Sequence, residues 1–113
     1  AYYVLRYLFD EDCPMPMYVL ICHDVPNSAE LRQQHRPAHL ARLLPMLESG
    51  QLKLAGFTPS AHGEPTVTGS IIMADFPDDK AVQDWVSQEP FLLNGVYSHI
   101  DIKPFVQSLP VAQ

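Results

Sequence analysis

The residues best suited to chemistry in this chain are Arg32, Arg36 and His39, which lie at positions i, i+4 and i+7. On a continuous helix this spacing places all three side chains on one face. Two guanidinium groups can hold a carboxylate, enolate or phenolate, and an imidazole can carry a proton at neutral pH. A solvated helix face often has the same charged pattern, so the spacing alone leaves a binding site and plain solvation as alternatives.

His35 and His39 are also four residues apart, a spacing that can bind a metal ion. Pro37 lies between them, and the segment offers no evident third ligand. We therefore expect no metal at this position. Three further histidines are expected to be structural or solvent-exposed: His23, His62 and His99.

Two other polar residues lie beside residues that interrupt regular structure. Glu89 precedes Pro90, so its carboxylate could cap a short helix, be solvated, or belong to a site. Ser70 follows Gly69 inside an apolar segment, a place where a small molecule can approach a sheet. We do not expect Ser70 to be a nucleophile, because no pattern places a base against it.

These side chains must be positioned by short strands that alternate with helices. Apolar and β-branched runs predict strands over residues 17–23, 52–58, 67–76 and 99–105. Ser28 is a good cap for a helix over 29–49, and Gly50 ends that helix. Proline removes a backbone donor and crowds the carbonyl four residues back, so we expect a break or kink near Arg36 and Pro37.

A second helix is predicted from Asp78 or Asp79 to Glu89, followed by a short helical turn over 91–94. The order strand, helix, strand, strand, helix, strand predicts a ferredoxin-like α+β sandwich, with two helices on one face of an antiparallel sheet. No helix remains to cover the other face. We therefore expect the sheet to pair with a second copy, giving a homodimer or a higher homo-oligomer.

The chain has 113 residues, of which 47% are hydrophobic, and this predicts one globular domain. We interpret residues 1–16 as an N-terminal extension, either an extra strand or a remnant, and residues 17–113 as the domain. The formal charge of −6 argues against nucleic acid and anionic membrane surfaces as partners. The spacing of Cys13 and Cys22 indicates plain thiols in a cytoplasmic protein.

Several segments together resemble the YCII-related (YciI-like) family. The resemblance runs in order from about Met17 to Phe105 and is carried by the following residues: Leu31-Arg32-x-x-x-Arg36-Pro37-Ala38-His39-Leu40-Ala41-Arg42-Leu43, Leu54-Ala55-Gly56, Thr68-Gly69-Ser70, Pro90-Phe91 with Gly95-Val96-Tyr97, and Lys103-Pro104-Phe105.

The resemblance implies a dimeric ferredoxin-like fold, similar to that of muconolactone isomerases and dimeric α/β-barrel proteins. It also implies a site built around a histidine–aspartate pair. The family histidine falls on His39, and the family aspartate falls on Glu89, which is one methylene longer. One relative in the degradation of chlorinated aromatics is a dehydrochlorinase.

From these residues we expect proton transfer, without a cofactor or metal, on a small anionic cyclic or aromatic molecule. His39 would be the general acid or base and Glu89 would orient it. Arg32 and Arg36 would hold the negative charge of the substrate, and Ser70 would donate a hydrogen bond to it. The alternative is a non-catalytic module of the same fold that binds a small ligand in the same pocket.

Overall fold

The computed structural model describes residues 15–111, and its elements follow the predicted order. The strands are β1 (Met17–Asp24), β2 (Leu52–Pro59), β3 (Val67–Asp75) and β4 (Tyr97–Phe105). The helices are α2 (Ala29–Ser49), α3 (Asp79–Ser87) and the short α4 (Pro90–Leu93). The N-terminal extension, interpreted as an extra strand or a remnant, spans residues 1–16, of which residues 1–14 lie outside the described part of the chain.

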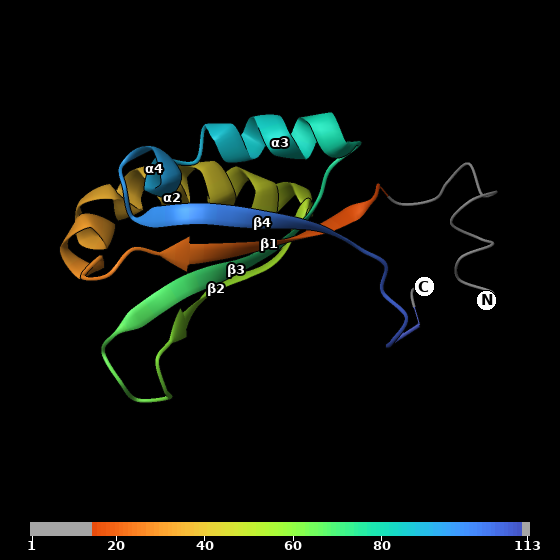
Figure 1. Ribbon diagram of the computed structural model, residues 1–113. Coiled ribbons are helices and arrows are strands. Elements are labelled where there is room, and N and C mark those ends of the chain that lie inside the picture. Colours follow the sequence, from red (N-terminus) through yellow and green to blue (C-terminus); the bar gives the residue numbers. More distant parts are fainter. Residues whose placement is uncertain (1–14, 112–113) are drawn as a thin grey trace.

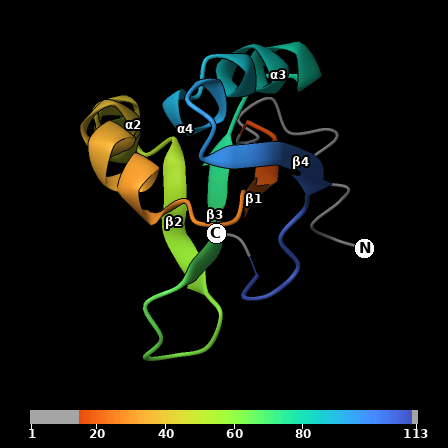
Figure 2. The same cartoon turned by 60° about the vertical axis from the view of Figure 1, so that its left-hand side comes forward.

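The four strands form one antiparallel sheet in the order β2-β3-β1-β4. All three helices lie on one face of this sheet (Figure 1). Helix α2 lies toward the β2 side, whereas α3 and α4 lie toward the β4 side (Figure 2). The α+β ferredoxin-like prediction is therefore confirmed.

Alternate residues of β1 separate the two faces of the sheet. Tyr18, Leu20 and Cys22 point toward the helices and are buried in the core. Their strand neighbours, including Val19 and Ile21, belong to the opposite face, which we call the open face. Between residues 15 and 111 no helix covers this face (Figure 1). Pairing of two copies through the open face stays a prediction.

Helix α2 runs without a break from Ala29 to Ser49, so the expected interruption near Arg36 and Pro37 is wrong. Both internal prolines, Pro37 and Pro45, are solvent-exposed. Water can therefore hydrogen-bond the backbone carbonyls that each proline leaves without an amide partner. The continuous helix keeps the i, i+4, i+7 face of Arg32, Arg36 and His39 intact.

Gly69 allows β3 to approach β1 closely. A Cβ atom at this position would lie 2.1 Å from the backbone oxygen of Cys22, which no other residue type could accommodate without a shift of the backbone. Close packing here brings the next residue, Ser70, against the end of β1.

None of the helices in residues 15–111 is long and apolar enough to cross a membrane.

Candidate functional site

A cavity of about 360 Å³ lies between α2 and the β2–β3 half of the sheet. Its volume is near the lower end of the range for small-molecule sites, roughly 300–1,000 Å³. The charged and polar side chains at the cavity come mainly from α2. The lining residues include Arg32, Arg36, His39, Leu40, Leu43, Ala55, Phe57, Ser70, Ile72 and Phe91.

His39 is joined to Glu89 across the interface of α2 and α4. The distance from His39 Nδ1 to Glu89 Oε1 is 2.5 Å, and the two side chains are only 11% and 1% exposed. Glu89 is not part of the cavity wall, whereas His39 is. Because Nδ1 is engaged by Glu89, Nε2 is the ring nitrogen left to meet a molecule in the cavity.

The start of α4 places the Glu89 carboxylate. Pro90 occupies the first turn, and Glu89 has the extended backbone that a residue before proline favours. Glu89 Oε2 accepts a hydrogen bond of 3.3 Å from the backbone N–H of Phe91. The sequence analysis left capping and a contact with the site as alternatives, and this carboxylate makes both contacts. The extra methylene relative to aspartate therefore does not prevent contact with His39.

Phe91 holds the imidazole from a second direction. The rings of His39 and Phe91 are stacked, with centroids 4.1 Å apart and planes 10° from parallel. Phe91 in turn packs edge-on against Tyr97 at 5.4 Å. The imidazole of His39 is thus fixed by a carboxylate at Nδ1 and by an aromatic ring on one face, which limits its rotation.

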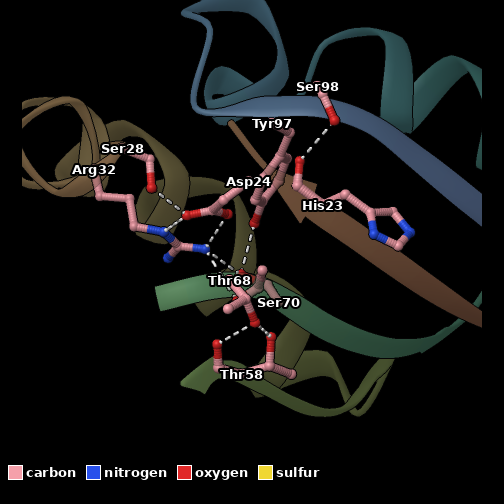
Figure 3. Close-up of polar contacts among 10 residues, drawn as sticks. His23, Asp24, Ser28, Arg32, Thr58, Thr68, Ser70, Tyr97 and Ser98 are labelled. Atoms are coloured by element: carbon pink, nitrogen blue, oxygen red, sulfur yellow. Dashed lines mark hydrogen bonds and ion pairs between the residues drawn. The ribbon is translucent and has the colours of Figure 1, made fainter. Parts of the chain in front are cut away.

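Arg32 is held by Asp24 at the end of β1. Arg32 donates from Nε to Asp24 Oδ2 at 2.6 Å and from Nη2 to Oδ1 at 2.8 Å (Figure 3). Ser28 donates its hydroxyl proton to the same carboxylate, so this side chain does not cap α2 as expected. The Asp24 side chain is 1% exposed, and its charge is offset by the guanidinium.

Ser70 is connected to this pair and to Tyr97. Its Oγ accepts hydrogen bonds from Arg32 Nη2 at 2.8 Å and from the Tyr97 hydroxyl at 2.9 Å (Figure 3). Burial raises the pKa of Tyr97 above its ordinary value, so the phenol keeps the proton it donates. With two bonds accepted, Ser70 has its own hydroxyl proton left to donate toward the cavity it lines.

Arg36 differs from Arg32 in its surroundings. It lines the same cavity but is exposed, and it makes no hydrogen bond or ion pair with residues 15–111. Arg32 has only Nη1 left after its bonds to Asp24, Ser70 and the backbone oxygen of Gly69. The more available positive charge at the cavity therefore belongs to Arg36.

The structure brings the five candidate site residues together: Arg32, Arg36, His39 and Ser70 line one cavity, and Glu89 contacts His39, the residue it was paired with. The sequence analysis missed Asp24 and Tyr97. Asp24 directly follows the first predicted strand with no pattern that marks it as functional, and Tyr97 was named only within the segment Gly95-Val96-Tyr97 of the resemblance. Among residues 15–111, no cluster of three metal-ligating side chains includes His35 or His39.

Comparisons with known proteins identify the family of this chain. The model of the YCII-related domain matches residues 16–106. Protein YciI of Escherichia coli O6:H1 is 39% identical over 93 residues, which cover 79% of this chain and 95% of that protein. An uncharacterized protein of Haemophilus influenzae is 37% identical over 92 residues, covering 78% of this chain and 94% of that protein.

A solved structure has the same fold. It is a 5-chloro-2-hydroxyhydroquinone dehydrochlorinase from Burkholderia phenoliruptrix, in complex with 2,5-dihydroxybenzoquinone, and it superposes with a TM-score of 0.72 at 22% identity. The match covers 80% of this chain and 94% of that chain. The match of the domain model over most of the chain, together with relatives above 30% identity, shows that this protein belongs to the YCII-related family.

Proposed function

We propose that this protein is a cofactor-free enzyme that transfers protons on a small anionic cyclic or aromatic molecule. The observation that carries the proposal is the buried His39–Glu89 pair, whose imidazole lines a cavity that also contains an uncommitted arginine. The fold shared with a dehydrochlorinase supports a small-molecule enzyme. The reaction type we expect is a lyase, isomerase or dehydrochlorinase reaction.

His39 is the proposed general base and acid. In its neutral form, Nδ1–H donates to Glu89 and the lone pair of Nε2 is available to the substrate. When Nε2 takes a proton, the imidazolium is stabilised by the adjacent carboxylate, which is 1% exposed and poorly screened. The same imidazolium can return the proton to another atom of the substrate, which is the step an isomerase needs.

A chlorinated hydroquinone illustrates the balance of such a reaction. His39 removes a hydroxyl proton, and the ring ketonises by accepting a proton at the carbon that carries chlorine. Chloride then leaves with its bonding electron pair while a second hydroxyl proton is lost, which leaves a quinone. The net change is loss of one HCl, so no external electron acceptor is required.

The remaining polar residues would bind and orient the substrate. Arg36, which is free of other partners in the described chain, would receive the carboxylate or phenolate. Ser70 would donate a hydrogen bond to a substrate oxygen. Arg32 would mainly fix Ser70 in position and contribute the charge of Nη1. Apolar side chains such as Leu40, Ile72 and Phe91 would contact the ring.

The test compares the wild type with His39→Gln, using 5-chloro-2-hydroxyhydroquinone and a series of small unsaturated lactones. Chloride release, quinone absorbance and exchange of substrate C–H protons in D₂O are followed. We expect wild-type turnover, and a decrease of about a hundredfold to ten-thousandfold in kcat for the variant. Binding of 2,5-dihydroxybenzoquinone by His39→Gln, measured by calorimetry, shows whether its cavity is intact.

Two outcomes contradict the proposal. One is equal turnover or proton exchange by the wild type and His39→Gln. The other is saturable binding of these molecules by the wild type with neither turnover nor proton exchange, which is the result expected of a non-catalytic binding module. Arg36→Gln serves as a matched variant, and we expect it to weaken binding of the anionic ligands while the fold is unchanged.

A further inference from the structure

A second group of chemically capable side chains lies on the open face of the sheet, away from the cavity. His23 and His99 are direct cross-strand partners in the β1–β4 register. Asp101 follows His99 by two residues and therefore points to the same face as His99. The His23 ring points away from the Arg32–Asp24 pair (Figure 3). These three side chains are thus independent of the site described above.

The three side chains converge. The rings of His23 and His99 are stacked, with centroids 4.3 Å apart and planes 12° from parallel. His23 Nε2 lies 2.9 Å from Asp101 Oδ2. One ligand atom from each residue lies within 4.8 Å of the other two, and within residues 15–111 this is the group of three ligating side chains with that property.

A hydrogen bond to Ser98 fixes the tautomer of His99. The Ser98 hydroxyl donates to the backbone oxygen of His23 at 3.2 Å and lies 2.8 Å from His99 Nδ1. Because its proton is already donated, Ser98 Oγ accepts from Nδ1–H of His99. This bond selects the tautomer in which Nε2 carries the lone pair, the form in which a histidine binds a metal ion.

We propose that His23, His99 and Asp101 form a binding site for a zinc-type divalent transition-metal ion. Two imidazole nitrogens and one carboxylate oxygen are a common ligand set for such ions, with a fourth position left for water or another ligand. The ion takes the place of the proton between His23 Nε2 and Asp101 Oδ2, and a neutral His23 then carries its proton on Nδ1, so that the ligand stays a neutral imidazole. The site is accessory to the cavity and does not depend on the proposed reaction.

Binding requires the three ligand atoms to move closer to one another than the 4.8 Å within which they lie. Metal–ligand distances of about 2.0–2.2 Å in a tetrahedron separate the ligands by roughly 3.3–3.6 Å. In the single protomer the side chains of His23 and Asp101 are 42% and 47% exposed, so they can rotate without disturbing the core of that protomer. Lys103 lies nearby on the same strand face and its charge opposes that of the ion, so we expect weaker binding than in a closed structural zinc site.

The experiment titrates the 113-residue protein with ZnCl₂ by calorimetry and follows the histidine side chains by NMR. We expect saturable binding of one ion per protomer, with shifts at His23 and His99. His99→Gln and His23→Gln are each expected to weaken zinc binding by about tenfold or more. His35→Gln is the matched control, because it removes a helix histidine that belongs to a different candidate pair.

The control variant also separates this proposal from a site at His35 and His39. Unchanged zinc affinity in His35→Gln, together with weakened affinity in His99→Gln, supports the open-face site. No zinc binding by the wild type, or equal affinity in the wild type and both open-face variants, overturns it. Lys103→Gln gives a further measurement: removal of the opposing charge should tighten zinc binding, and no change or a weakening contradicts the assigned position.

Discussion

The two faces of the sheet carry the same kind of pair, a histidine bonded to a carboxylate, in opposite surroundings. His39 and Glu89 are 2.5 Å apart on the helix side, with side chains 11% and 1% exposed. His23 and Asp101 are 2.9 Å apart on the open face, with exposures of 42% and 47%. The partners are far apart in sequence in both cases, so tertiary structure creates both pairs.

Burial decides what each pair can do. Around Glu89 little water is available to screen charge, and Phe91 stacks on the imidazole, so the His39 ring has a fixed orientation. Such a ring can exchange a proton with a molecule at a defined position. His23 and Asp101 are partly solvated and can rotate, which suits them to bind an ion and not to orient a reaction.

The largest expected effect concerns the reactivity of the Cys22 thiol. Cys22 precedes His23 in β1 and points to the opposite face of the sheet. Burial raises the pKa of the Cys22 thiol to about 12, so roughly one thiol in ten thousand is ionised at pH 8. An exposed thiol with a pKa of about 8.5 is ionised in roughly one molecule in four. In a Cys13→Ser background, alkylation of Cys22 should therefore be more than about a thousandfold slower than that of an exposed cysteine.

The matched reference is Lys103→Cys, Cys22→Ala in the same background, which places the thiol at an exposed position of the open face on the neighbouring strand β4. Iodoacetamide labelling at pH 8 is followed by mass spectrometry, and labelling in urea shows that each thiol reacts when unfolded. Similar rates for the two folded variants would mean that the two faces of the sheet do not differ in burial as described.

The next effect is on stability and compares the two histidines. Replacing His39 by alanine leaves the Glu89 carboxylate buried with a single N–H donor, which we expect to destabilise the protein by about 3 kcal/mol. His23→Ala leaves Asp101 in contact with solvent, so we expect no measurable change. Urea unfolding of both variants checks this difference, and equal losses of stability would contradict it.

A smaller effect distinguishes two further carboxylates, Asp24 on the helix side of the sheet and Asp101 on the open face. Asp24→Asn keeps the shape of the side chain but removes the charge that faces the Arg32 guanidinium, at an expected cost of about 2 kcal/mol. Asp101→Asn on the open face should leave the urea midpoint unchanged. If Asp24→Asn is also unchanged, the Arg32 guanidinium is solvated to a greater degree than its 16% exposed side chain indicates.

Much of the fold was predictable because the chain alternates apolar runs with clear stop signals. Gly50 ends α2 in the left-handed conformation, and Pro90 begins α4, as their residue types indicate. The break near Pro37 was predicted from the same kind of rule and was wrong. Solvent exposure of the freed carbonyl is a property of the folded surface, which the proline rule does not contain.

The candidate site was predictable to different extents. The spacing of Arg32, Arg36 and His39 identified one helix face, and the resemblance to the YCII-related family pointed to Glu89. The bond from Arg32 to Asp24 was not predictable, because it depends on how the end of β1 meets the first turn of α2. The cross-strand pair of His23 and His99 likewise depends on the β1–β4 register.

The sequence by itself determined the order of strands and helices, because this order follows from local periodicity. The spacing of Arg32, Arg36 and His39 gives them one face only on a continuous helix, and the folded structure decided that α2 continues through Pro37. Tertiary structure decided which charges are available. It neutralises Arg32 with Asp24, leaves Arg36 without a partner in the described chain, and buries Glu89 against His39. The physical reason is that the free energy of a charge depends on its burial and partners, and both are set by elements far apart in the chain.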